Sequence, residues 1–323
     1  MSRPASLDGR QWRQVALLTL GALALYLTLR ALPTGTNLHQ LDFTVTGTGA
    51  LELCDPANPQ FVPVVAARSP VTLTVTPQPG DDYRFLLHLA TSSGKPIGPA
   101  ELLEVHTRKL HLLIVDPKLG DYQHVHPEPT ANIGEWSFTF APAFTTTYRV
   151  FADFTPIATG RSLYASADIG GTGPADSTGG PAARDTPPAW PAETWRAERD
   201  GFVFQLKPSV QPIRAGQPVD LNFILARTDG GPVIMEPVMG AFAHLVTFDA
   251  ARSGFAHLHP DPANAANLSV TSAPSAASGT TAVTNPHLAF KLTIPSPGPY
   301  VIWAQVKLDG HERFVPFWFE VAP

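Results

Sequence analysis

Residues 111–129 read HLLIVDPKLGDYQHVHPEP, and residues 244–262 read HLVTFDAARSGFAHLHPDP. The two stretches align without a gap at a separation of 133 residues, and each ends in His-x-His-Pro-acid-Pro. Apolar residues alternate with others on both sides of a short turn, which is typical of a β-hairpin. The sequence therefore predicts two copies of one β-rich unit, each carrying the same three histidines.

The similarity continues on both sides of these hairpins. Residues 71–97 and 203–233 both contain a strand-like run, a Pro-rich turn, a glycine and a second strand-like run. Residues 148–154 match 300–306 at a separation of 152 residues, and the 19 additional residues fall in a loop of the second copy. Self-similarity over most of the chain indicates a tandem repeat.

The composition supports a chain of short strands. The sequence contains 34 Pro and 25 Gly, which break helices and mark turns. We expect a mainly β chain with two tandem immunoglobulin-like β-sandwich domains behind one N-terminal transmembrane helix. The predicted division is a cytoplasmic N-terminus over 1–13, a transmembrane signal anchor over 14–32, a stem over 33–68, sandwiches over 69–168 and 199–323, and a Pro/Gly-rich linker over 169–198.

The N-terminus has the charge pattern of a targeting segment. Val15–Leu29 carries no charged residue and follows Arg3, Arg10 and Arg13. An excess of positive charge before an apolar run keeps that end in the cytoplasm and directs the remainder across the membrane. We expect a single-pass protein of the bacterial inner membrane with the bulk of the chain in the periplasm; a cleaved signal peptide is the alternative.

Charge and cysteine content argue against a nucleic-acid-binding protein and against a disulfide-stabilised one. The net charge is −5 and no polybasic run is present, so the sequence does not predict nucleic-acid binding. Cys54 is the sole cysteine, so no disulfide can form within the chain. We interpret Cys54 as a small side chain in a strand rather than as a ligand.

The hairpin register decides whether the histidines meet. If Leu113 pairs with His124, then His111 lies opposite His126, and alternation places all three imidazoles on one face. A slip of one residue would turn His111 to the other face. The same argument applies to the second copy, with His244, His257 and His259.

Three neutral imidazoles on one face predict a bound copper or zinc ion in each copy. A fourth ligand recurs in position, because His106 and Met239 each stand five residues before the first histidine of their hairpin. His and Met together favour copper over zinc. The alternative is a cluster of hydrogen-bonded histidines with a structural role.

Each copy resembles the extracytoplasmic YtkA-like and CopC-like copper-handling domains. The residues that carry the resemblance are mostly turn glycines and prolines: Gly216, Gly230–Val233, Met239–Gly240 and Pro297–Tyr300. The resemblance implies a periplasmic metal-handling or accessory role, with a periplasmic protein that donates or accepts the metal as its partner. The chain departs from CopC-like proteins because no histidine opens a mature domain, so their copper site is not carried over.

Three functions remain open from the sequence. The first is a membrane-anchored periplasmic metal-binding protein with one three-histidine site per domain. The second is a structural or protein-interaction module without metal. The third is a metalloenzyme, which we do not expect, because no Ser-His-Asp or phosphate-loop signature is present and the recurring acids Glu128 and Asp261 follow a proline.

Overall fold

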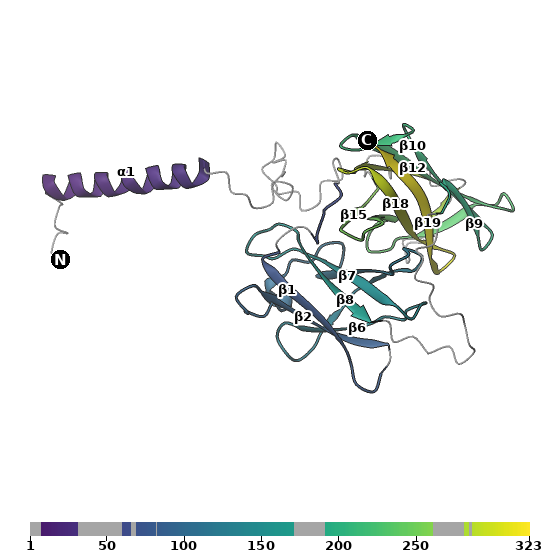
Figure 1. Ribbon diagram of the computed structural model, residues 1–323, viewed down its shortest axis with the longest axis horizontal. Coiled ribbons are helices and arrows are strands. Elements are labelled where there is room, and N and C mark those ends of the chain that lie inside the picture. Colours follow the sequence, from purple (N-terminus) through teal and green to yellow (C-terminus); the bar gives the residue numbers. More distant parts are fainter. Residues whose placement is uncertain are drawn as a thin grey trace. The chain divides into compact units, whose positions relative to one another are not determined.

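The computed structural model describes residues 8–31, 60–65, 69–81, 83–170, 191–260, 281–283 and 286–323 (Figure 1). Apart from one long helix, the described part is built of β-strands, which confirms the mainly β prediction. The immunoglobulin-like assignment and the domain boundaries stay predictions. Cys54, most of the expected stem and most of the expected linker lie outside the described residues.

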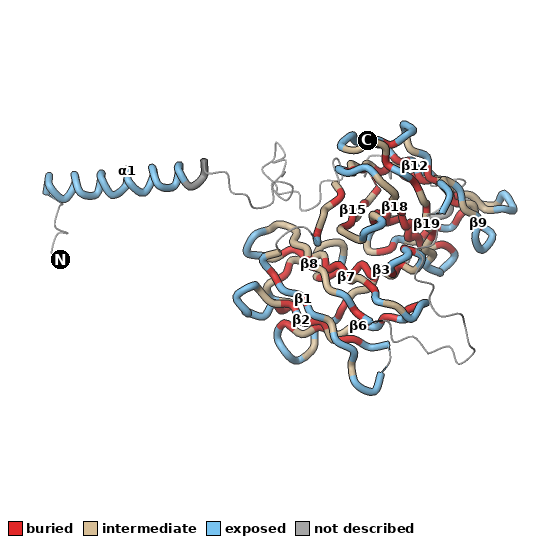
Figure 2. Tube along the Cα trace, in the orientation of Figure 1, coloured by how far each residue is buried: buried red, intermediate tan, exposed pale blue. Residues whose placement is uncertain are grey.

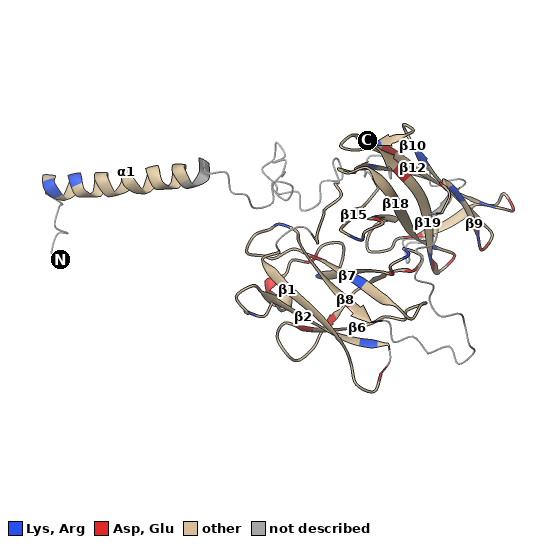
Figure 3. Cartoon of the chain, viewed as in Figure 1, with Lys and Arg blue, Asp and Glu red and all other residues tan. Residues whose placement is uncertain are grey.

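The helix is α1 (Gly9–Ala31), in a unit, Met1–Asp42, that is distinct from Phe43–Pro323. Asp8 caps its start, because Oδ1 accepts hydrogen bonds from the backbone N–H of Arg10 and Gln11 at 2.9 and 2.8 Å. Arg10 and Arg13 lie at the N-terminal end of α1 (Figure 3). Within the described residues, no helix combines the length and hydropathy of a membrane span. The transmembrane assignment of 14–32 stays a prediction.

The first repeat consists of two four-stranded sheets, β1-β2-β6-β5 and β4-β3-β7-β8, with antiparallel neighbours. A short 3-10 helix, η2, precedes β3. The bounds are β1 (Val71–Pro77), β2 (Arg84–Thr91), η2 (Pro99–Glu101), β3 (Leu110–Val115), β4 (Tyr122–Val125), β5 (Glu128–Pro129), β6 (Glu135–Thr139), β7 (Thr147–Phe154) and β8 (Leu163–Gly170).

Alternate side chains from the two sheets of the first repeat fill one core. Leu87 of β2 and Leu112 of β3 are fully buried and belong to the same hydrophobic cluster, as does Trp136 of β6. Burial of such side chains stabilises the fold by about 1.5–3 kcal/mol each. A continuous apolar layer therefore lies between the two sheets.

The second repeat also has two sheets. One has the order β17-β12-β10-β9, and the other contains β11-β19-β18-β13-β16 with the hairpin β14–β15 attached to β18. The bounds are β9 (Arg196–Arg199), β10 (Phe202–Pro208), β11 (Ile213–Arg214), β12 (Pro218–Arg227), β13 (Val233–Glu236), β14 (His244–Asp249), β15 (Phe255–Leu258), β16 (Thr281–Val283), β17 (His287–Thr293), β18 (Gly298–Leu308) and β19 (His311–Ala322).

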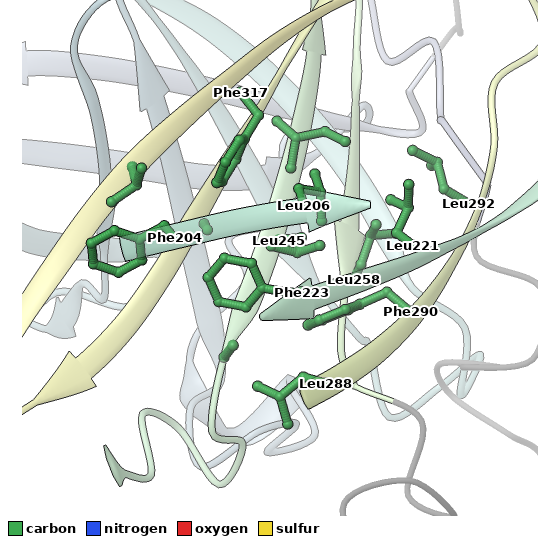
Figure 4. Packing of buried hydrophobic residues seen from close by; sticks show 14 of the residues in the cluster. Phe204, Leu206, Leu221, Phe223, Leu245, Leu258, Leu288, Phe290, Leu292 and Phe317 are labelled. Atoms are coloured by element: carbon green, nitrogen blue, oxygen red, sulfur yellow. The ribbon is translucent and has the colours of Figure 1, made fainter. Parts of the chain in front are cut away.

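The core of the second repeat repeats this arrangement and includes several packed aromatic rings. Phe204 of β10 and Phe223 of β12 stack with ring centroids 6.5 Å apart, and Phe317 of β19 meets Phe223 edge-on. Figure 4 shows these rings with Leu245 and Leu258, the inward residues of the β14–β15 hairpin. The hairpin therefore presents one face to the core of its own repeat.

The other face of each hairpin is also buried. All residues of β3 are buried, and β7 beside it is mostly buried (Figure 2). Apolar residues that face away from the core of their own repeat form one cluster shared by both repeats, which we call the joint core. It consists of Leu113, Val115, Leu119, Tyr122, Phe151, Val246, Phe248, Phe255, Val301 and Trp303, together with Val64. The two repeats therefore pack through the face on which the sequence places the histidines.

Polar contacts also join the repeats at this face. Trp303 donates its indole N–H to the carbonyl oxygen of Leu119 at 3.2 Å. The Arg149 guanidinium donates to the carbonyl oxygen of Arg252 at 3.0 Å. Because both acceptors are backbone atoms of the hairpin turns, these bonds fix the turns of one repeat against the strands of the other.

Candidate metal centre

The structure confirms the register on which the prediction depended. Leu113 pairs with His124 between β3 and β4, and Val246 pairs with His257 between β14 and β15. One nitrogen from each of His111, His124 and His126, the first triad, lies within 4.8 Å of the others. The same holds for the second triad, His244, His257 and His259. Each triad can therefore hold a metal ion.

Both hairpins are preceded by the same backbone turn. His106 and Met239, at corresponding positions, both have φ of 50°, and Thr107 and Gly240 follow with φ of 67° and 81°. Non-glycine residues rarely adopt this left-handed conformation. The turn brings the carbonyl oxygen of Val105 to 3.0 Å from Nε2 of His111, the first histidine of the hairpin.

Hydrogen bonds fix the proton positions in the first triad. A carbonyl oxygen only accepts, so Nε2 of His111 carries the hydrogen that bonds Val105, and Nδ1 keeps its lone pair. His124 Nδ1 lies 3.0 Å from Oε1 of Gln305 and donates to it. Its Nε2 therefore keeps a lone pair, and that nitrogen lies 3.2 Å from Nδ1 of His111.

The amide of Gln305 is itself oriented by a carboxylate. Its Nε2 donates to Oε2 of Glu312 at 2.9 Å, so its oxygen must face His124. Ligating histidines are commonly held in this way, with the non-ligating N–H bonded to a carboxylate or carbonyl oxygen. The chain Glu312–Gln305–His124 thus presents Nε2 of His124 as a ligand.

The second triad repeats this pattern with one change. His244 Nε2 donates to the carbonyl oxygen of Val238 at 2.8 Å. Nδ1 of His257 faces Oδ2 of Asp153 at 3.5 Å, a carboxylate in place of the amide. The remaining nitrogens, Nδ1 of His244 and Nε2 of His257, lie 3.3 Å apart.

A cation placed between the paired nitrogens would satisfy both lone pairs. Two unprotonated nitrogens repel each other, and a proton is disfavoured because burial lowers the pKa of His111 and His124. A tetrahedral Zn²⁺ at about 2.0–2.1 Å from each nitrogen places the two about 3.3–3.4 Å apart. The separations of 3.2 and 3.3 Å therefore match the bite of a metal ion.

The third histidine of each triad has an unused nitrogen. Nε2 of His126 and Nε2 of His259 are buried and have no hydrogen-bond partner. Leaving a buried polar atom unpaired costs about 1–3 kcal/mol. A metal ion shared with the other two histidines of the triad would satisfy each atom.

Burial keeps the imidazoles neutral, as metal binding requires. Desolvation is the largest cause of the shift in every case, with neighbouring histidines adding to it at His126. It lowers the pKa of His126 to about 3 and the pKa of His244 to about 4. Burial also lowers the pKa values of His257 and His259 well below their usual range.

His106 and Met239, the expected fourth ligands, are placed differently from the triads. His106 does not join either group of nitrogens within 4.8 Å. Its ring stacks instead on His259 of the other repeat, with centroids 3.8 Å apart and planes inclined by 27°. Nε2 of His106 is also buried and unpartnered. Met239 is half-buried at the equivalent turn and stays a prediction as a ligand.

Sequence reasoning missed Asp153 and Gln305. These residues occupy corresponding positions in β7 and β18, and each is the strand neighbour of the first histidine of its own hairpin, His111 or His244. Each side chain reaches across to the opposite triad. The available signal was their alignment at the 152-residue separation, together with the presence of a polar residue within a mostly apolar strand-like run.

Three solved structures that the chain matches are each only distantly similar to it. Alpha-2-macroglobulin from Escherichia coli, activated by porcine elastase, is 11% identical with a TM-score of 0.23, over 80% of this chain and 22% of that one. The chicken interferon gamma receptor alpha chain is 10% identical with a TM-score of 0.20, over 80% and 100%. The fibronectin(III)-like modules of Clostridium thermocellum CbhA are 9% identical with a TM-score of 0.18, over 78% and 94%.

TM-scores of this size carry no argument about fold or function. The chain spans only about a fifth of the alpha-2-macroglobulin that it matches. No curated protein matches the chain. A family model described as a domain of unknown function, DUF8832, matches residues 65–169 and 197–323, ranges that correspond to the two repeats. The chain therefore belongs to the DUF8832 family.

Proposed function

We propose that this chain is a metal-binding protein that holds copper or zinc, with copper preferred, through one histidine triad in each repeat. The observation that carries the proposal is the pair of facing lone pairs in each triad, 3.2 Å apart in the first and 3.3 Å apart in the second. Donors made entirely of imidazole suit copper and zinc, whereas magnesium and calcium prefer oxygen ligands.

A role in holding or passing metal fits the donors better than catalysis does. Asp153 is the carboxylate that contacts a triad, and it faces the non-ligating nitrogen of His257. Glu128, one of the two recurring acids, is exposed and lies 3.7 Å from Arg108. We therefore propose an accessory protein that buffers metal or exchanges it with a partner protein.

Metal content tests the proposal directly. The purified chain, loaded with Cu²⁺ or Zn²⁺ and freed of excess ion, should contain close to two ions per molecule. The double variant His124→Ala/His126→Ala should retain about half, because it removes two of three ligands from one triad only. A variant that keeps all the metal would place the ions elsewhere.

The alternative is a structural cluster that joins the two repeats without metal. The observation in its favour is that His111, His124 and His244 already have hydrogen-bond partners outside their own triads. This alternative predicts a melting temperature that does not change when Cu²⁺ or Zn²⁺ is added. Binding to the folded state alone would instead raise it with metal concentration.

We also propose that the protein works outside the cytoplasm. The support is in the sequence, where three arginines precede an apolar segment without charge. The location can be tested by fusing, after residue 323, a reporter enzyme that is active only in the periplasm. An active reporter is expected, and activity only of a cytoplasmic reporter would contradict it.

A further inference from the structure

The two triads are close neighbours across the joint core. The ring centroid of His124 lies 5.2 Å from that of His257 and 6.1 Å from that of His244. The centroid of His111 lies 6.0 Å from that of His257. Rings of one triad thus contact rings of the other, so two bound ions would occupy one shared cluster of imidazoles.

The orienting groups of the two triads are exchanged between the repeats. Asp153 belongs to the first repeat and faces His257 of the second, whereas Gln305 belongs to the second repeat and accepts from His124 of the first. Each triad therefore has a polar group of the opposite repeat beside the non-ligating nitrogen of its second histidine. The packed pair of repeats thus supplies the surroundings of both triads.

The exchanged groups differ in charge. A carboxylate against the non-ligating nitrogen raises the basicity of a metal-bound imidazole more than a neutral amide does. Asp153 places its oxygen 3.5 Å from Nδ1 of His257. At His124 the nearest carboxylate, Glu312, acts only through the intervening amide of Gln305.

We propose that the two triads form a single two-ion centre across the interface of the repeats, and that the second triad binds its ion more tightly than the first because Asp153 contacts His257. This inference rests on the proposed metal-binding function. The stacking of His106 on His259 adds to the difference, because it covers the second triad with a ring from the other repeat.

Titration of the metal-free full chain with Zn²⁺, in competition with a chromophoric chelator, tests this order. Two binding steps of different affinity are expected. Asp153→Asn should weaken the tighter step by about 10–100-fold, the usual cost of losing such an orienting group. Asp220→Asn is the matched control, because that exposed carboxylate pairs with Lys291 and does not contact either triad.

Exchanging the amide and the carboxylate beside His124 gives the reciprocal test. It predicts a gain in metal affinity, which a misfolded variant could not produce. Gln305→Glu combined with Glu312→Gln keeps the charge and the hydrogen bond but places the carboxylate against His124. The weaker step should tighten by about 10–100-fold, so that the two steps approach each other. Circular dichroism of each variant verifies that it is folded.

A paramagnetic probe tests the closeness of the ions. The chain loaded with two Cu²⁺ should show dipolar broadening in its electron paramagnetic resonance spectrum, and the chain loaded with one should not. Two sharp, independent signals at full loading would overturn the shared centre. Two binding steps of equal affinity, neither of them changed by Asp153→Asn, would overturn the order of affinities. No binding of either ion would overturn the proposed function itself.

Discussion

The two hairpins share their histidines and the turn that precedes them, but they differ at the residue just before the second strand. In the first repeat this residue is Asp121, which accepts hydrogen bonds from the Tyr148 hydroxyl at 2.7 Å and from the backbone N–H of Ala143 at 2.9 Å. In the second it is Gly254, which lies against the backbone of Val62. One hairpin is closed by a side chain and the other by an added segment of chain.

The comparison shows which face of the hairpin has the same residue pattern in both repeats. The outward face keeps the same pattern in both copies, with histidines at one end and apolar residues of the joint core along the rest. The edge of the hairpin differs, because it meets different neighbours in each repeat. The shared requirement is therefore the interface between the repeats.

The largest expected effect comes from breaking the joint core at Trp303, which corresponds to Phe151 in the first repeat. Trp303→Ala should lower the free energy of unfolding by about 3–5 kcal/mol, because it opens a cavity and removes the bond to Leu119. Phe151→Ala should cost a similar amount. Denaturation by urea provides the measurement, with Trp12→Ala, an exposed position in α1, as a control that should change little.

A cost below about 1 kcal/mol for Trp303→Ala would mean that the two repeats do not depend on this interface. Such a result would contradict the packing on which both triads rely.

A smaller effect is expected from the edge at which the hairpins differ. A Cβ at Gly254 would lie 1.8 Å from the carbonyl oxygen of Val62, so Gly254→Ala must displace the paired segment. We expect a loss of about 1–3 kcal/mol in unfolding free energy. Gly120→Ala in the first hairpin is the control, because its Cβ would make only an ordinary contact with Phe144.

Equal stability of these two alanine variants in thermal melts would show that the pairing of Val62 with Phe255 contributes nothing.

Local pattern predicted much of the candidate site. Alternation within the hairpin gave the pairing of Leu113 with His124, and the repeat carried it to Val246 and His257. These features depend on neighbours along two adjacent strands, which a period of two residues specifies. The strand content followed from turn residues and short apolar runs in the same way.

The rest depended on how the repeats pack, which no local period specifies. Nothing near His106 in the sequence indicates that its ring stacks on His259, or that Asp153 turns toward His257. β3 is apolar apart from His111 and is buried on both faces, but the face against which it packs is a long-range property.

A third effect concerns acid. In the metal-free chain, burial lowers the pKa of His244 to about 4 and that of His126 to about 3, against 6.5 in the unfolded chain. The unfolded state therefore takes up more protons below pH 6.5, and stability falls as the pH falls toward these values. The melting temperature should drop between pH 7 and pH 4, and less so in His124→Leu/His257→Leu. Equal slopes for the two proteins would contradict this source of acid sensitivity.

The most direct measurement is anomalous diffraction at the zinc absorption edge, from crystals of the chain grown with Zn²⁺. We predict two strong peaks per chain, each about 2.0–2.1 Å from one nitrogen of every histidine in a triad. Peaks on surface carboxylates alone, with the six triad imidazoles free of metal, would contradict the account.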